Sequence, residues 1–404
     1  MRVLLSILLL SFCQFVLAQS ESTAEDSLHK GLSSFISNTS IGGYGNVLYK
    51  RNFNQDYSSI NLERFVLFLG HKFSKKIYFF SELEVEDALV SGAEEGGEIA
   101  LEQCYLKFNT NPNNYFVAGL FLPRIGILNE NHLPNTFNGN ERTQVETLIL
   151  PSTWRELGIA YYGNLNRIPL TYSIALMNGL DAASFEHGSA LREGRFEGRN
   201  ASANNLALSA SLKYNKNNLI AQISSYYGGS VGLAAKQADS LQLDSGFFGT
   251  PVLVNEANLQ YESNGFSLRL LGSYISIPNA LEINRAYASN TPQSAYGVYL
   301  EAAYNIFKVL HSGYNQELNF FARYEKLDLN YSIPENGIID ETLNQQHIVI
   351  GLNYLPIKNV SIKADIRLQH TGKQNPALII NPSPTLPVYK LDNTFLNLGI
   401  GYSF

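Results

Sequence analysis

The sequence is poor in tryptophan, methionine, cysteine and charge. Among 404 residues there are one Trp, two Met and two Cys, and 16 % of the residues are charged. Asp and Glu (35) outnumber Lys and Arg (29), so the formal net charge is −6 and the chain lacks the basic balance of a nucleic-acid-binding protein. A hydrophobic content of 45 % excludes intrinsic disorder, which needs low hydrophobicity and high net charge.

Long apolar runs are missing except at the start of the chain. Arg2, an apolar run to Leu17 and a small residue at Ala18 predict a secretory signal peptide over residues 1–18, and the polar residues 19–33 predict a short periplasmic segment. A lipoprotein signal at Cys13 is disfavoured by the bulky Phe12 before it. Cleavage leaves Cys104 alone, which excludes an intramolecular disulfide. Because no later run reaches the ~20 residues of a spanning helix, a membrane protein with this sequence has to be a closed β-barrel.

The chain is rich in residues that favour strands and turns, with 24 Tyr, 23 Phe and 31 Gly. Residues 206–214, 360–370 and 396–404 alternate apolar and polar side chains with a period of two. This alternation is typical of strands with one apolar and one wet face. It predicts an all-β protein, in which the apolar face meets either a second sheet or lipid.

The lengths of the connections favour a transmembrane antiparallel β-barrel of about 16 strands. Short turns alternate with longer loops, as in outer-membrane barrels with short periplasmic turns and long extracellular loops. The predicted strands are 34–49, 61–73, 76–86, 99–109, 114–122, 154–163, 169–178, 203–214, 218–228, 251–262, 265–277, 294–306, 314–330, 341–354, 360–370 and 394–404. The predicted long loops are 50–60, 87–98, 123–153, 179–202, 229–250, 278–293, 331–340 and 371–393. The barrel itself is expected to occupy residues 34–404.

Aromatic residues support a barrel in the outer membrane. The chain ends in Phe404, with Tyr402 and Ile400 on the same face, which looks like the signal that such barrels present to the barrel assembly machinery. Aromatic residues near strand ends are expected to form girdles at the two membrane interfaces, in contact with lipid and lipopolysaccharide. The residues expected in these girdles are Tyr49, Tyr115, Tyr214, Tyr261 and Tyr354.

The 123–153 loop is the candidate constriction of the barrel. It is about thirty residues long in an otherwise economical pattern of connections, and such loops are usually functional. Sixteen strands leave an aqueous channel, which a loop folded into the lumen would narrow. The charged candidates in or beside this loop are Arg124, Glu130, Glu141, Arg142, Glu146 and Arg155, and His132 lies among them.

The chain resembles the phosphate-selective porin O and P family, in the form found in Bacteroidetes-type bacteria. The resemblance rests on the sixteen strands, the turn from Gly119 to Pro123, the long third loop with a Pro and an Arg near its end, and Phe404. It implies a passive diffusion channel in the outer membrane, commonly a homotrimer, without a cofactor. Family members that select phosphate carry a dense ladder of Arg and Lys along the lumen.

The predicted lumen wall has no such ladder. Eight basic candidates stand against seven acidic ones, and neither sign sets a selectivity by itself. Thirteen of the wall candidates are Arg64, Glu82, Glu84, Lys107, Lys213, Glu256, Arg269, Glu301, Arg323, Glu325, Lys363, Asp365 and Arg367. Arg155 and Glu86 complete the two sets.

Other functions stay open at this stage. The alternatives to a porin for small hydrophilic solutes or ions are a surface barrel without a channel and a substrate-specific uptake channel. An aromatic track through Tyr105, Phe121, Tyr162 and Tyr226 would favour the uptake channel. No metal site is expected, because Glu82, Glu84 and Glu86 lack the spacing of a Ca²⁺ loop. Enzyme activity is not expected, because the His187 and His311 segments show no acidic partner at a telling spacing.

Overall fold

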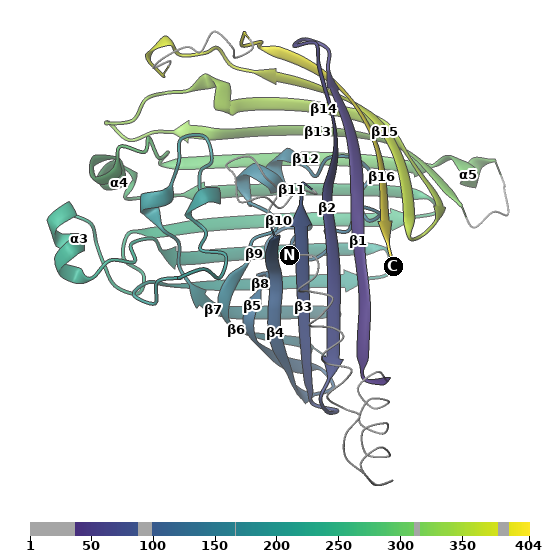
Figure 1. The fold of residues 1–404 in the computed structure, drawn as a ribbon, viewed down its shortest axis with the longest axis horizontal. Coiled ribbons are helices and arrows are strands. Elements are labelled where there is room, and N and C mark those ends of the chain that lie inside the picture. Colours follow the sequence, from purple (N-terminus) through teal and green to yellow (C-terminus); the bar gives the residue numbers. More distant parts are fainter. Residues whose placement is uncertain (1–36, 88–98, 166, 311–315, 379–387) are drawn as a thin grey trace, which may run out of the picture.

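The computed structural model describes residues 37–87, 99–165, 167–310, 316–378 and 388–404. The predicted signal peptide and the 19–33 segment lie outside the described residues. Sixteen antiparallel strands form a closed barrel in which each strand pairs with its neighbour in sequence and β16 pairs with β1 (Figure 1). The strands are β1 (Thr39–Asn52), β2 (Tyr57–Lys72), β3 (Ile77–Glu86), β4 (Ile99–Asn111), β5 (Asn114–Phe121), β6 (Glu156–Leu165), β7 (Leu170–Asn178), β8 (Leu206–Lys216), β9 (Leu219–Gly229), β10 (Pro251–Ser263), β11 (Phe266–Ser276), β12 (Ser294–Asn305), β13 (Glu317–Ser332), β14 (Asn344–Ile357), β15 (Val360–Thr371) and β16 (Asp392–Ser403).

The alternation in the sequence gives the barrel an apolar outside and a polar inside. On β15, Ile362, Ile366 and Leu368 are exposed on the outer face, and the residues between them, Lys363 and Arg367, are buried. The same exposed apolar face continues over β14 and β16. The predicted class and number of strands are therefore confirmed, and each predicted strand overlaps one observed strand.

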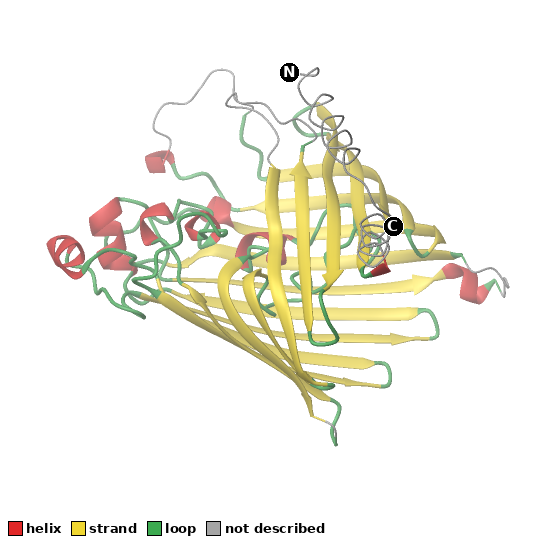
Figure 2. Cartoon of the chain, turned by 60° about the horizontal axis from the view of Figure 1, so that its bottom comes forward, coloured by secondary structure: helices red, strands yellow, loops and turns green. Residues whose placement is uncertain are grey.

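The connections differ between the two ends of the barrel. We call the end with longer connections the loop end and the opposite one the turn end; Figure 2 shows most helices gathered with the longer loops. The described helices are η1 (Val145–Ile149), η2 (Ala182–Ser184), η3 (Arg192–Gly194), α3 (Ala235–Leu241), α4 (Ala280–Tyr287), α5 (Ile306–Val309), η4 (Glu341–Leu343) and η5 (Pro376–Leu378). Within the described ranges, none of the helices has the length and apolar character needed to cross a membrane.

The connection between β1 and β2 is shorter than predicted. The predicted long loop 50–60 is a short turn, because β1 continues to Asn52 and β2 already begins at Tyr57. The Asn52 side chain closes this turn by accepting hydrogen bonds from the backbone N–H groups of Asn54 (3.0 Å) and Gln55 (3.3 Å). Such an Asx turn reverses the chain within a few residues.

The inside of the barrel is not uniformly polar. At the loop end, buried apolar side chains on β7 to β13 face inward and pack against the 123–153 loop. Leu327 and Leu329 belong to this cluster, which explains why apolar residues change parity along β13 after Tyr324. The register of β12 and β13 also shifts between Ser294 and Tyr296. The inward apolar residues of β13 therefore pack against the loop and do not line a water-filled lumen.

Tyr115 is a second correction. It was expected in an outer girdle, but it points into the barrel, where its ring stacks on that of Tyr162 with centroids 4.9 Å apart. Its neighbour Phe116 takes the outer face. Because successive side chains alternate on a strand, a shift of one residue separates a girdle position from an interior one.

Candidate functional site

The 123–153 loop folds into the barrel and contacts its wall on nearly every side. It begins after β5 and ends before β6, and in between it reaches strands from both halves of the barrel. Its contacts reach β1, β15 and β16 at one side, β10 to β14 at another, and β3, β4 and β8 at a third.

Glu141 and Asn140 attach the loop to the seam where the barrel closes. Glu141 forms ion pairs with Lys50 on β1 (2.7 Å) and Arg367 on β15 (2.8 Å). Asn140 donates to the carboxylate of Asp365 (2.7 Å) and to the backbone carbonyl of Asn397 (3.2 Å). Lys50 and Asn397 are paired across the β1–β16 seam, so the loop bridges both sides of it.

Lys363 and Arg323 hold the middle of the loop. The Lys363 Nζ donates to three loop carbonyls, those of Pro134 (2.5 Å), Phe137 (2.7 Å) and Gly139 (2.8 Å). Arg323 lies under the loop and pairs with Glu325 (2.8 Å) and Glu301 (3.3 Å). Both glutamates also reach the loop, since Asn138 donates to Glu301 (2.9 Å) and the N–H of Val145 to Glu325 (3.1 Å).

Glu146 fastens the loop to itself. Its wholly buried carboxylate accepts hydrogen bonds from the N–H groups of Ile127 (2.6 Å) and Leu128 (2.7 Å) and from the Tyr299 hydroxyl (2.9 Å). Burial raises the pKa of Glu146, although these hydrogen bonds act to lower it. Gly126, with a positive φ of 81°, lets the backbone pass this carboxylate, because a Cβ there would lie 2.9 Å from Oε1. Glu146 is thus an internal tie of the loop and lines none of the cavities described below.

An aromatic cavity of about 290 Å³ lies between the loop and the wall of β3 to β6. Arg124 and Glu130 of the loop line it, together with Lys107 of β4. The Arg124 guanidinium lies 4.5 Å from the ring centroid of Tyr162, and the Lys107 ammonium lies 3.9 Å from that of Tyr115. Glu130 pairs with Lys213 on β8 and stands 3.9 Å from Arg124. Tyr105 and Phe121 also line this cavity, whereas Tyr226 packs on Trp154 elsewhere.

A mouth cavity of about 920 Å³ opens at the loop end. Six arginines and four glutamates line its described part. Arg155 pairs with Glu197 (2.8 Å), which also holds Arg195 (2.8 Å). The lining charges are Arg64, Arg142, Arg155, Arg192, Arg195, Arg199, Glu84, Glu86, Glu193 and Glu197. A third cavity, of about 500 Å³, lies toward the turn end and contains Arg269, which donates to the carbonyl of Thr136 (2.9 Å).

The structure places the thirteen wall candidates on the inner face, but most of them lie under the loop. Nine are buried: Glu82, Glu84, Glu256, Glu301, Arg323, Glu325, Lys363, Asp365 and Arg367. Arg64, Lys107, Lys213 and Arg269 are half-buried. Glu256, for example, accepts from Ser224 (2.5 Å) and from the N–H of Gly126 in the loop.

Some residues of the site carry no signal that sequence analysis could use. Lys50 falls in the predicted loop 50–60, and nothing in the sequence pairs Tyr299 with Glu146 or Asn138 with Glu301. His187 contacts Asp340 (2.8 Å) and Asn290 (3.0 Å) across the loop end, and His311 lies outside the described residues. These partners come from distant parts of the chain, so only the folded barrel brings them together.

The ion pairs of Glu141 give a prediction about acid. Burial alone would raise the pKa of Glu141, but the charges of Arg367 and Lys50 outweigh it and lower the pKa to about 2. Because the pKa is depressed in the folded state, the ion pairs of Glu141 contribute fully to the free energy of unfolding above the ordinary pKa of 4.5. This contribution is lost as the pH falls toward 2. We expect the free energy of unfolding to drop between pH 5 and pH 2.5 by up to about 3 kcal/mol more in the wild type than in Glu141→Gln.

Urea unfolding in detergent, followed by the fluorescence of the single Trp154, measures this difference. Glu130→Gln is the matched control, because Glu130 is also a loop carboxylate in an ion pair but contacts neither Lys50 nor Arg367. An equal loss of unfolding free energy at low pH in the wild type and in Glu141→Gln would contradict a stabilising role of the Glu141 ion pairs.

Comparisons with known proteins identify a relative in sequence and several solved structures with a similar fold. No protein-family model matches the chain. A protein of Aquifex aeolicus (strain VF5), described only as uncharacterized, is 33 % identical over 350 residues, which is 83 % of this chain and 77 % of that protein. The residue-level resemblance to phosphate-selective porins O and P is thus not supported by a family match.

Three solved structures share the fold at low identity. Salmonella typhi OmpF, solved in complex with daunomycin, is 12 % identical with a TM-score of 0.53 and covers 91 % of this chain and 98 % of its own. The anion-selective porin from Comamonas acidovorans is 11 % identical with a TM-score of 0.50, covering 91 % and 99 %. In-vitro folded OmpT of Vibrio cholerae, in a trimer form, is 10 % identical with a TM-score of 0.50, covering 91 % and 99 %. At these identities the likeness concerns the fold alone: a 16-stranded barrel like those of outer-membrane porins.

Proposed function

We propose that this chain, which belongs to the same family as the Aquifex aeolicus protein, is an outer-membrane channel for the passive diffusion of small hydrophilic solutes or ions. The observation that carries the proposal is the 123–153 loop, folded into a closed 16-stranded barrel and anchored there by buried charges. A belt of exposed apolar side chains around the outside suits lipid, and the polar inner wall suits water. Passage requires no cofactor and no catalysis.

The proposed channel is narrow. The loop borders the aromatic cavity and the turn-end cavity inside the barrel, and these two cavities share no lining residue. A constriction of this kind sets a low size limit, as loops and charged rings do in other channels. Solutes of the size of inorganic ions and small metabolites fit such a path better than oligosaccharides.

Charge at the mouth gives the proposed channel a preference for anions. Six arginines against four glutamates line the described part of the mouth cavity, an excess of positive charge in that lining. This is the part of the phosphate-porin resemblance that the structure supports best, although the deeper wall charges are paired with one another. Rings of basic side chains select anions through their sign.

Single-channel recording in a planar bilayer with a tenfold KCl gradient tests whether the barrel conducts ions and whether it prefers anions or cations. We expect discrete conductance steps and a reversal potential that corresponds to a chloride permeability roughly two- to threefold above that of potassium. Arg192→Glu with Arg199→Glu should lower this ratio or invert it, because both side chains line the mouth cavity. Lys236→Glu, on the exposed face of α3, is the matched control and should leave the ratio unchanged. Silence of a folded barrel would contradict the channel and favour a surface barrel.

Assembly and location are part of the same proposal. We place the chain in the outer membrane, exported by a cleaved signal peptide, inserted by the barrel assembly machinery through Phe404 and surrounded by lipid and lipopolysaccharide. A homotrimer is supported by the trimer form of the Vibrio cholerae structure. Conductance steps in groups of three, together with the mass of the detergent complex, would support it.

A substrate-specific uptake channel is the second candidate. The aromatic cavity favours it, because Tyr105, Tyr115, Phe121 and Tyr162 bring four aromatic rings to one lining. Aromatic faces beside Lys107 and Arg124 suit a ring-shaped or anionic solute. Block of the single-channel current by micromolar concentrations of one solute would favour this function over general diffusion.

A further inference from the structure

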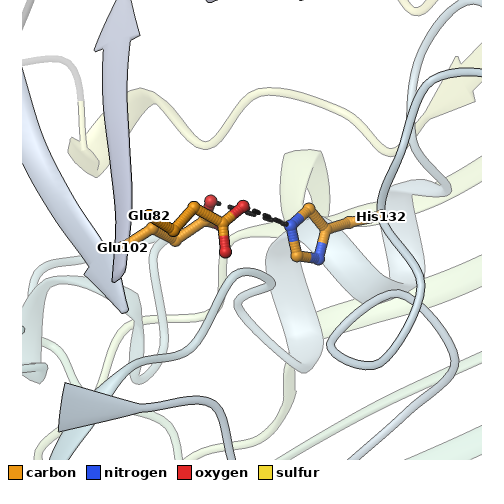
Figure 3. Close-up of side chains that lie close together, drawn as sticks. All are labelled: Glu82, Glu102 and His132. Carbon is orange, nitrogen blue, oxygen red and sulfur yellow. Dashed lines mark hydrogen bonds and ion pairs between the residues drawn. The ribbon is translucent and has the colours of Figure 1, made fainter. Parts of the chain in front are cut away.

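Three buried side chains meet where the 123–153 loop touches β3 and β4. His132 of the loop directs Nε2 toward Oε1 of Glu82 (3.4 Å) and Oε2 of Glu102 (3.6 Å), as Figure 3 shows. One ligand atom from each residue lies within 4.8 Å of the other two. All three residues are buried, with Glu82 1 % and Glu102 0 % exposed.

A β-bulge brings the two carboxylates to the same place. Glu82 pairs with Gln103 and the next residue, Leu83, pairs with Leu101, so Glu102 is the extra residue of β4. Bulges redirect side chains and are frequent beside functional sites. Here the bulge turns Glu102 inward next to Gln103, whose Nε2 donates to Oε2 of Glu82 at 2.6 Å. The other carboxylate oxygen of Glu82 is left to face His132.

The backbone sets the tautomer of His132. Its Nδ1 lies 3.2 Å from the carbonyl oxygen of Leu128, which can only accept, so Nδ1 carries the proton. In the neutral imidazole Nε2 then carries a lone pair and no proton. It faces two carboxylate oxygens, which are also hydrogen-bond acceptors. A ring N–H bonded to a carbonyl, with the second nitrogen free, is the usual arrangement of a histidine that ligates a metal.

Burial makes the arrangement costly without a cation. Two carboxylates at this depth repel each other, which the charge of Arg142 in the loop offsets only for Glu102, and Oε1 of Glu102 has no hydrogen-bond partner in the described structure. The Tyr44 hydroxyl lies 3.4 Å from Oε2 of Glu102 and supplies one polar contact. A divalent ion would balance both negative charges.

We propose that Glu82, Glu102 and His132 bind one divalent transition-metal ion of the zinc type. Ligands about 2.1 Å from a tetrahedral ion lie roughly 3.4 Å apart, which matches the two measured separations from Nε2. One imidazole with carboxylates suits zinc better than calcium, which prefers six to eight oxygen ligands. Gln103 and Tyr44 orient the carboxylates from behind, and Leu128 orients the imidazole.

The ion would tie the loop to the wall between two cavities. His132 and Gln103 line the aromatic cavity, and Ala100 and Cys104 of the same strand line the mouth cavity. The site is therefore a structural clasp of the loop. It does not depend on the proposed channel, because metal binding is measured on the folded barrel in detergent without any bilayer current.

Zinc titration of the metal-stripped full chain tests the site. Calorimetry is expected to show one Zn²⁺ bound per chain, with Ca²⁺ failing to compete at equal concentration. His132→Gln should weaken zinc binding by at least about a hundredfold, more than the loss of an outer partner usually costs. His370→Gln is the matched control, because it removes an exposed imidazole that pairs with a carboxylate, and it should bind zinc as the wild type does.

X-ray absorption at the zinc edge identifies the ligand atoms of the zinc bound to the wild type. This measurement tests the site even if a variant fails to fold. One imidazole nitrogen with oxygen ligands is the expected shell. A sulfur ligand would point to Cys104, and a shell of water alone or with two imidazoles would also overturn the proposal. So would the absence of a one-to-one zinc complex in the folded wild type, or unchanged zinc affinity in folded His132→Gln.

Discussion

Replacing Arg323 by methionine is expected to lower the free energy of unfolding by about 3–5 kcal/mol, the usual cost of breaking a buried ion pair from one side. The Arg323 side chain is 2 % exposed and stands between Glu301 and Glu325, both equally buried. Methionine fills a similar volume but leaves two carboxylates without their counter-charge. Those carboxylates also hold Asn138 and Val145, so the loss is expected to extend to the loop.

Urea unfolding in detergent, read by Trp154 fluorescence and by circular dichroism, measures this loss. The compensating control is Arg323→Met combined with Glu301→Gln and Glu325→Gln. Both glutamines keep acceptors for the loop without charge, and replacing a whole buried ionic group is often close to neutral. The triple variant should therefore regain most of the stability. A single variant as stable as the wild type would show that Arg323 is not the counter-charge that the distances indicate.

Lys363→Met is expected to raise the single-channel conductance about twofold or more and to increase the noise of the open channel. Its ammonium donates to three carbonyls between Pro134 and Gly139, in the part of the loop nearest the turn end. Without these hydrogen bonds residues 134–139 lose three contacts with β15, although Asn140 and Glu141 remain bound to it, and the constriction widens. Bilayer recording at symmetric KCl measures the change.

Two controls separate the effect of the attachment from that of the charge. Lys358→Met removes an exposed lysine from the turn before β15 and should leave the conductance unchanged. Lys363→Arg keeps the charge and several donors and should remain close to the wild type in noise. Identical recordings from Lys363→Met and the wild type would contradict a role of this lysine in holding the constriction.

The barrel could be predicted from the sequence because its signal is local and repeated. Residues such as Ile362 and Leu368 alternate with Lys363 and Arg367, and this alternation follows directly from the geometry of a strand between an apolar and a polar phase. The count of strands needed only this pattern and the turns between them. The first loop was overestimated because the Asx turn at Asn52 depends on one side chain, which the composition of residues 50–60 hides.

The candidate site could be predicted only as a loop. Its length and charges marked the 123–153 segment. However, Glu141 pairs with Lys50 and Arg367, which are 91 and 226 positions away from it along the chain. Glu82, Glu102 and His132 share no spacing typical of metal ligands. A bulge in β4 and the path of the loop bring them together, and neither leaves a periodic trace in the sequence.

The contacts of Asn140 and Glu141 also bear on how the barrel stays closed. β1 and β16 are the two ends of the strand order, so their pairing completes the barrel. Glu141 binds Lys50 on one side of that seam and accepts from Asn397 on the other at 3.2 Å. Because the loop contacts both strands of the seam, these contacts resist separation of β1 from β16 and stabilise the closed form of the barrel.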